Sequence, residues 1–162
     1  MNPEIKTILY ATDMGDHMRP VFRFALELAR KHKAKIVMLH VMEPLNSGIL
    51  TAIDIYMPKI KSKEVLQDGM HKVLGKMQKR LEKFCEDEKE IHPDDCEYIS
   101  KVKVVSGRSA ETIIHQADKL GVDLIVVGSH TDPSIRSSLL GSTARNVTQL
   151  SRRPVLVVPV YE

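Results

Sequence analysis

The stretch VDLIVV at residues 122–127, which runs directly into the polar loop GSH at 128–130, decides the fold class of this chain. It is apolar apart from one aspartate. A second run, VLVVPV at residues 155–160, follows after a short helical segment. Nearly continuous apolar runs of this kind are typical of parallel strands that are covered on both faces. The two runs therefore predict an α/β protein built on a parallel sheet.

The rest of the chain repeats this alternation of apolar runs and helical periodicity. Strands are expected at residues 5–11, 35–41, 98–105, 122–127 and 155–160. Helices are expected at residues 20–32, 64–88, 109–120 and 142–151. With right-handed crossovers between the strands, this order predicts a doubly wound, five-stranded parallel sheet with helices on both faces.

The middle of the chain holds one long helix and one unusual segment. The helix at 64–88 carries an apolar stripe that steps by three and four positions. Its members are Leu66, Met70, Leu74, Met77, Leu81 and Phe84. Residues 44–63 are too apolar for a free linker. We expect an ordered or semi-ordered segment there that covers another surface, and a partner subunit is one candidate for that surface.

Length, charge and cysteine content narrow the class of protein. A chain of 162 residues fits one domain, 1–162. The net charge of +3 is too small to require nucleic acid or a membrane surface as a partner. Cys85 and Cys96 lack metal-site spacing, so we expect two free thiols in a reducing compartment. The polar N-terminal residues show no targeting signal, and the expected location is the cytoplasm.

In doubly wound sheets, ligands bind beyond the carboxyl ends of the strands, where the strand order reverses. That rule draws attention to the loop after the first strand. Asp13 there either contacts a ligand amine, hydroxyl or divalent cation, or caps a turn, and the local sequence leaves both interpretations open. For Asp16 we expect the structural role, as the cap of the following helix.

The loop after the fourth strand leads into a helix that opens with Gly141, Ser142 and Thr143. Free backbone N–H groups at a helix N-terminus, together with two hydroxyls, form a natural phosphate site. Arg136 could neutralise charge nearby. On these residues alone, a solvent loop with Ser142 as the helix cap is the better-supported interpretation.

The sequence resembles the universal stress protein family along essentially its whole length. ILYATD at residues 8–13 is similar to that family's opening strand and acidic loop, and residues 122–160 are similar to its closing half. Gly107 and Glu111 also match the family pattern. The resemblance implies the strand order 3-2-1-4-5 and a homodimer formed through the last strand, Val155–Val160. An apolar edge strand of this kind needs a partner or a cover.

The nucleotide-binding branch of that family carries a glycine frame, G-x2-G-x9-G followed by serine or threonine. Here the frame consists of Gly128, Thr131, Gly141 and Ser142, with its spacing intact and threonine in place of the second glycine. The threonine side chain either crowds the ribose and phosphates or offers its hydroxyl as a polar contact. The resemblance implies that ATP or a related adenine nucleotide binds, with Mg²⁺.

The resemblance also implies which residues surround the nucleotide. Those beside the adenine and ribose are Ala11, Thr12, Asp13 and Val41; those along the ribose and phosphate path are Gly128, His130 and Thr131; those at the phosphates are Gly141, Ser142 and Thr143. Asp13 is the expected contact to a nucleotide-bound Mg²⁺, and Arg136 is the expected cation beside the phosphates.

Motifs of other nucleotide-handling proteins are missing from the sequence. It has no Gly-x-x-x-x-Gly-Lys-Ser/Thr loop and no Gly-x-Gly-x-x-Gly fingerprint. It offers no set of residues for a catalytic mechanism either. We therefore predict a nucleotide-binding regulatory protein of the stress response with little or no turnover. Two alternatives stay open: a dimeric interaction protein that binds no nucleotide, motivated by Thr131, and a slow ATPase in which Asp13 and a metal position water.

Overall fold

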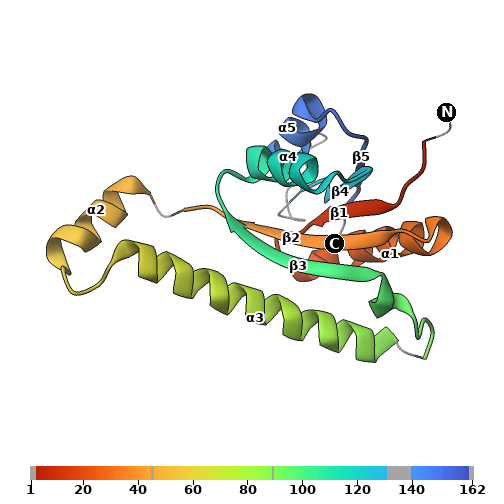
Figure 1. The fold of residues 1–162 in the computed structure, drawn as a ribbon, viewed down its shortest axis with the longest axis horizontal. Coiled ribbons are helices and arrows are strands. Elements are labelled where there is room, and N and C mark those ends of the chain that lie inside the picture. Colours follow the sequence, from red (N-terminus) through yellow and green to blue (C-terminus); the bar gives the residue numbers. More distant parts are fainter. Residues whose placement is uncertain (1–2, 45, 89, 131–139, 161–162) are drawn as a thin grey trace.

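The computed structural model describes residues 3–44, 46–88, 90–130 and 140–160. Its centre is a five-stranded parallel sheet in the order β3-β2-β1-β4-β5, which confirms the predicted fold class (Figure 1). The strands are β1 (Thr7–Ala11), β2 (Lys35–Met42), β3 (Ile99–Ser106), β4 (Leu124–Gly128) and β5 (Val155–Val158). They differ from the predicted ranges only at their ends.

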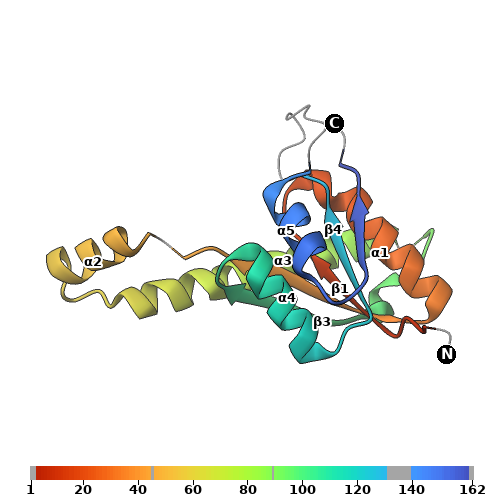
Figure 2. The same ribbon diagram turned by 90° about the horizontal axis from the view of Figure 1, so that it is seen from above.

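Helices cover both faces of this sheet (Figures 1 and 2). The chain also forms two short 3-10 helices, η1 (Asp16–Met18) and η2 (Asp95–Tyr98). The α-helices are α1 (Arg19–His32), α2 (Ser47–Tyr56), α3 (Ser62–Glu88), α4 (Ser109–Leu120) and α5 (Ser142–Leu150). Side chains of α1 and α3 belong to one core cluster, and side chains of α4 and α5 belong to the other. The two layers of helices thus bury most of β1 and β4 and half of β2, whereas no residue of the edge strand β3 is buried.

The central position of β1 in the sheet explains why its sequence is almost entirely apolar. Ile8 and Tyr10 enter the core on the α1 and α3 side, whereas Leu9 and Ala11 enter the core on the α4 and α5 side. Successive side chains of a strand point to opposite faces of the sheet. A strand that is covered on both faces therefore needs apolar residues at every position.

The predicted helix ends follow from local chemistry. Pro20 lies in the first turn of α1, where its missing N–H costs no hydrogen bond. Gly121 ends α4 in the left-handed conformation with φ of 61°. Glycine has no Cβ and adopts this conformation without strain. Asp16 departs from its predicted role, because Gly15 and Met18 occupy the N-cap positions of η1 and α1 and neither helix has a side-chain cap.

Residues 46–63 include α2 and, with the N-terminal half of α3, extend away from the sheet as a helical arm (Figures 1 and 2). No residue of α2 is buried, and Tyr56 is 81% exposed. The predicted segment is helical over Ser47–Tyr56 and leaves this chain's own core uncovered; that it covers a partner subunit stays a prediction. The apolar stripe of α3 was only partly correct as a core prediction, because Met77 and Phe84 alone are buried in that helix. Leu81 packs partly buried against the same core, whereas the N-terminal half of the helix extends beyond the sheet (Figure 1).

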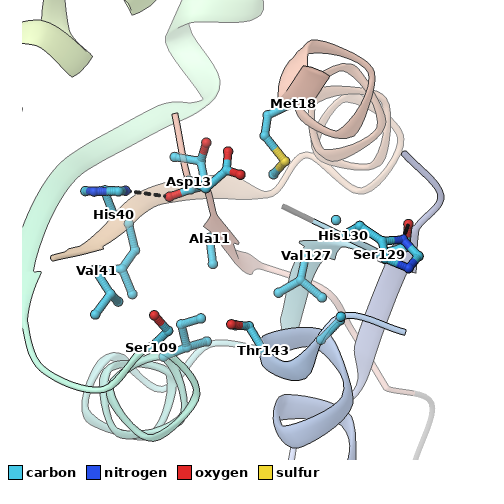
Figure 3. A pocket seen from close by; sticks show the side chains of 16 residues that line it. Ala11, Asp13, Met18, His40, Val41, Ser109, Val127, Ser129, His130 and Thr143 are labelled. Atoms are coloured by element: carbon cyan, nitrogen blue, oxygen red, sulfur yellow. Dashed lines mark hydrogen bonds between the residues drawn. The ribbon is translucent and has the colours of Figure 1, made fainter. Parts of the chain in front are cut away.

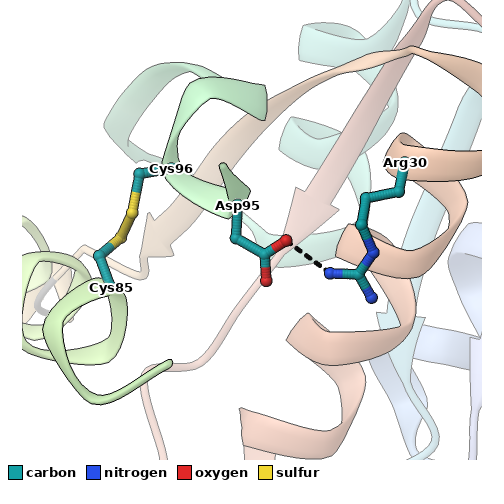
Figure 4. Close-up of a disulfide and its surroundings, with 4 residues drawn as sticks. All are labelled: Arg30, Cys85, Asp95 and Cys96. Atoms are coloured by element: carbon teal, nitrogen blue, oxygen red, sulfur yellow. Dashed lines mark hydrogen bonds and ion pairs between the residues drawn. A yellow bond between two sulfur atoms is a disulfide. The ribbon is translucent and has the colours of Figure 1, made fainter. Parts of the chain in front are cut away.

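The prediction of two free thiols is wrong, because Cys85 and Cys96 form a disulfide (Figure 4). The chain reverses between the end of α3 and η2, which brings the two Cα atoms to 6.1 Å. This distance lies within the range of about 4.4–6.8 Å that a disulfide bridges. Next to it, the buried Asp95 carboxylate accepts a hydrogen bond of 2.5 Å from Nη1 of Arg30. The bridge and the ion pair together fix the C-terminal end of α3 and η2 against α1.

In the part of the chain that the structure describes, no helix combines the length and apolar character needed to cross a membrane.

Candidate functional site

A cleft opens at the carboxyl ends of β1 and β4, which are neighbours in the sheet (Figure 3). The helices that follow these strands, α1 and α5, pack on opposite faces of the sheet. Their loops therefore separate and leave a crevice between them, as expected at the point where the strand order reverses. The cleft encloses a cavity of about 120 Å³.

The loop after β1 forms one wall of the cleft. The N–H of Thr12 donates to the carbonyl oxygen of Leu39 at 2.9 Å, which holds the loop against β2. Asp13 accepts the N–H of Gly15 on Oδ1 at 2.8 Å, while its Oδ2 lies 3.0 Å from Nε2 of His17. Asp13 therefore has the turn-capping role that the sequence left open, and its side chain also lines the cleft.

The second wall comes from β2 and the start of α4. His40 donates from Nδ1 to the carbonyl oxygen of Thr12 at 2.8 Å, since that oxygen can only accept. This bond joins β2 to the loop after β1. Val41, Ser109 and Ile113 line the cleft next to it. The sequence analysis had placed Val41 here but missed His40, Ser109 and Ile113.

The loop after β4 forms the third wall and is anchored by Ser129. The N–H of Ser129 donates to the carbonyl oxygen of Val158 at 2.9 Å, and the buried Oγ of Ser129 accepts the N–H of Val160 at 3.0 Å. Nδ1 of His130 lies 3.0 Å from the same Oγ. These bonds tie the end of β4 to the chain that leaves β5, so the loop is held from both sides.

The N-terminus of α5 forms the fourth wall of the cleft. Gly141 is the N-cap residue of this helix, and its N–H donates to the carbonyl oxygen of Ser129 at 2.8 Å. A Cβ on Gly141 would lie 3.0 Å from that oxygen and 3.4 Å from Cα of His130. Thr143 and Ala144, in the first turn, line the cavity. The first-turn amides of a helix lack intrahelical acceptors and carry partial positive charge, which favours an anion at this end.

The structure brings most of the predicted site residues together at one cleft. Those that line the cleft are Ala11, Thr12, Asp13, Val41, Gly128, His130, Gly141 and Thr143. Ser142 follows the N-cap and is not among the lining residues, so the alternative of Ser142 as the cap is wrong. Thr131 and Arg136 lie outside the described residues.

The sequence analysis missed eight lining residues. These are Met18, Leu39, His40, Ser109, Ile113, Val127, Ser129 and Ala144. Ser109 could have been found, since it begins the helix after the third strand and so belongs to the same edge of the sheet. His40 gave no signal, because its position at the end of an apolar strand does not show which neighbour it contacts.

The charges of the cleft are few. Among the described lining residues, Asp13 is the one carboxylate, and there is no lysine or arginine. No group of three His, Cys, Asp or Glu side chains in the described part of the chain could hold a metal ion. Both oxygens of Asp13 already have partners. The described residues therefore do not fit a metal ion held by the protein alone.

Comparison with known proteins gives a family match over nearly the whole chain. A model of the universal stress protein family matches residues 4–159. The universal stress protein MJ0577 of Methanocaldococcus jannaschii is 25% identical over 98% of this chain and 97% of its own length. The universal stress protein YxiE of Bacillus subtilis is 29% identical over 93% of this chain and 97% of its own length.

Solved structures share the fold. The universal stress protein UspA from Lactobacillus plantarum superimposes with a TM-score of 0.70 at 21% identity, covering 97% of this chain and 99% of its own. A universal stress protein in complex with cAMP gives 0.57 at 23% identity, covering 96% and 98%. One from Archaeoglobus fulgidus in complex with dAMP gives 0.52 at 17% identity, covering 96% and 98%.

Proposed function

The chain belongs to the universal stress protein family, and on this premise we propose that it binds an adenine nucleotide, ATP, in the cleft between β1 and β4. Two relatives with the same fold hold adenine nucleotides, cAMP and dAMP. The observation that carries the proposal for this chain is the contact between Gly141 and Ser129. It brings the N-terminus of α5 to the carboxyl edge of the sheet, beside the loop that follows β1.

Each wall of the cleft offers groups that suit one part of the nucleotide. Val41 and Ile113 offer apolar surface for the adenine ring. Asp13 and the backbone beside it offer acceptors for the ribose hydroxyls or the adenine amine. The first turn of α5, with the Thr143 hydroxyl, suits the phosphates. Arg136 is proposed as the cation that compensates their charge.

Magnesium enters the proposal only with the nucleotide. The described residues offer one carboxylate, and Mg²⁺ in nucleotide sites is held mainly by phosphate oxygens and water. Binding without turnover also fits the described lining residues. Asp13 already pairs with Gly15 and His17, which leaves no carboxylate in the described wall to activate water. We therefore propose a regulatory role in which nucleotide binding alters contacts with other proteins. The cytoplasm is the proposed location, from the family alone.

A homodimer is part of the proposal. β5 lies at the edge of the sheet beside β4. The carbonyl oxygens of Pro154 and Val158 accept N–H groups of Ile125 and Ser129. Because inward and outward groups alternate along a parallel strand, the polar groups of Val155 and Val157 face the open edge. Two copies could pair there about a two-fold axis.

Calorimetric titration tests nucleotide binding. Protein freed of co-purified small molecules is titrated with ATP in the presence of Mg²⁺, and we expect saturable heat and a rise in melting temperature. The variant Thr143→Val removes one hydroxyl from the cleft and should weaken binding by about 3- to 10-fold. Thr148→Val is the matched control, since the Thr148 hydroxyl donates to Ala144 within α5 at 2.7 Å.

Two outcomes would overturn the proposal. Absence of heat and of thermal shift at millimolar ATP would remove nucleotide binding. Binding that appears only in Thr131→Gly would place the native chain with the non-binding dimeric proteins. Phosphate release that depends on Asp13 would instead favour the slow ATPase, whereas release that is unchanged in Asp13→Ala would be contamination.

A further inference from the structure

A second and larger cavity lies on the other side of the loop that follows β1. It measures about 450 Å³ and is bounded by β1, β2, η1, α1 and the C-terminal half of α3. It shares only Thr12 and Met18 with the cleft described above. The nucleotide proposal makes no use of this cavity.

The interior of this cavity is apolar. Six of its lining side chains belong to the core cluster between the sheet, α1 and α3. They are Tyr10, Met18, Phe22, Met38, Met77 and Phe84, each at most 8% exposed. Burial raises the pKa of the Tyr10 hydroxyl above its usual value, so this ring stays neutral. The cavity opens to solvent at a charged rim, and its apolar side chains suit the apolar part of a ligand.

Methionine and aromatic side chains share this interior. Phe22 stacks on Tyr10 with ring centroids 5.2 Å apart and meets Phe84 edge-on at 4.9 Å, which gives the cavity one firm wall. Four methionines line the remaining surface: Met14, Met18, Met38 and Met77. Unbranched thioether side chains adapt to flexible apolar ligands. The lining therefore favours an alkyl chain over a rigid polar ring.

The rim carries an excess of positive charge. Arg19 from α1 pairs with Asp87 at 3.0 Å, whereas Arg80 donates from Nη1 to the carbonyl oxygen of Met14 and places Nη2 4.0 Å from the Asp16 carboxylate. Lys83 adds a third cation on the same side of α3. With three cations against two carboxylates among the lining residues, the rim has a net charge of +1. An anionic head group at this rim would lie beside the guanidinium and ammonium groups, where charge-assisted hydrogen bonds are strong.

We propose that this cavity binds a medium-chain fatty acid, with the alkyl chain inside and the carboxylate at the rim beside Arg80 and Lys83. The apolar interior selects the chain, and the charge of the rim selects an anion over a neutral or cationic head group. Each additional buried methylene should tighten binding about fourfold until the cavity is full. Hexanoate, octanoate and decanoate should therefore bind in rising order.

Methionine methyl NMR gives a direct test, because four of the chain's eight methionines line the cavity. Protein labelled at the methionine methyl groups is titrated with decanoate below its micelle concentration. We expect the signals of Met14, Met18, Met38 and Met77 to shift and saturate. Met57, which is 54% exposed on the arm, reports adventitious binding to exposed apolar surface.

Head-group charge is tested with decanol and decyltrimethylammonium as matched probes. Lys83→Gln should weaken decanoate binding by about tenfold and leave decanol unchanged. Lys79→Gln, on an exposed part of the same helix, is the control. Leu81→Trp should fill the cavity and abolish binding of every probe; should it fail to fold, the Lys83 and Lys79 variants still decide the question.

The outcomes separate clearly. Saturating shifts at the four cavity methionines, with decanoate preferred over decanol, support the proposal. Shifts at Met57 alone, no shifts at all, or equal affinity for decanoate and decanol in both wild type and Lys83→Gln would overturn it. Since Lys83 and Leu81 do not line the nucleotide cleft, failure here leaves the nucleotide proposal untouched.

Discussion

The backbone N–H of Gly141 donates to the carbonyl oxygen of Ser129 at 2.8 Å. The N-cap residue of α5 therefore lies directly against the residue that follows β4. A side chain between these two segments would be crowded, because a Cβ on Gly141 would stand 3.0 Å from that oxygen. The contact sets where α5 begins and which groups of its first turn line the cleft. It links the sheet to the helix that the nucleotide proposal depends on.

Replacing Gly141 tests this contact. Gly141→Ala forces the backbone of Ser129 or the start of α5 to move, since the neighbouring atoms are main chain and cannot swing away. We expect the free energy of unfolding to fall by about 1–3 kcal/mol, the usual range for overpacking. Urea denaturation measures the change. An unaltered unfolding midpoint would show that the two segments separate freely.

The opposite sign is expected at Gly75, inside α3. A Cβ there would meet nothing within 4 Å, so Gly75→Ala adds a side chain without a clash. Alanine also loses less backbone entropy on helix formation. We expect the free energy of unfolding to rise by about 0.5–1 kcal/mol in the same urea experiment. A decrease would indicate that this part of α3 packs against something in solution, such as a second copy.

The Cys85–Cys96 bridge should stabilise the fold. The two cysteines are 11 positions apart in sequence, and closing a loop of similar length restricts the unfolded chain by about 3 kcal/mol. We expect a loss of that size in the Cys85→Ser, Cys96→Ser double variant, measured by thermal or urea unfolding. Reductant should reproduce the loss in wild type and have no effect on the variant. An equal response of both proteins to reductant would contradict the bridge.

The pair of Arg30 and Asp95 gives a further prediction. The Asp95 side chain is 5% exposed, and Arg30 also contacts Glu27 at 2.6 Å on the surface of α1. Asp95→Asn should destabilise the protein by about 2 kcal/mol, less than a fully enclosed pair because the Arg30 side chain is 26% exposed. Glu27→Gln is the comparison and should have a clearly smaller effect. If the two variants unfold at the same midpoint, the buried contact contributes no more to the free energy of unfolding than the surface contact does.

The proposed dimer depends on the free edge of β5. Val157→Pro removes an N–H that faces this edge and keeps the bonds between β4 and β5. We expect the mass measured by light scattering to fall from that of two chains to that of one, with secondary structure unchanged. Wild-type protein that is already monomeric at micromolar concentration would contradict the dimer.

The sequence predicted the sheet and most helices because their signals are local. The apolar run of β1, buried on alternating sides at Leu9 and Tyr10, shows its two covered faces in the sequence itself. Gly121 and Pro20 mark helix ends through conformations that belong to single residues. The site was predicted in part, since the ends of β1 and β4 meet wherever a sheet is doubly wound.

Only the tertiary structure decided the remaining features. His40 and Ser109 line the cleft because β2 and α4 pack beside β1, and Cys85 meets Cys96 because the chain reverses after α3. The apolar stripe of α3 repeats with the same spacing along the helix, yet Met77 and Phe84 are its only buried members. Periodicity shows which side chains share a face of an element. Whether that face meets the sheet, a distant residue or solvent depends on how far the sheet extends and where the chain turns, and this is settled only when all elements pack together.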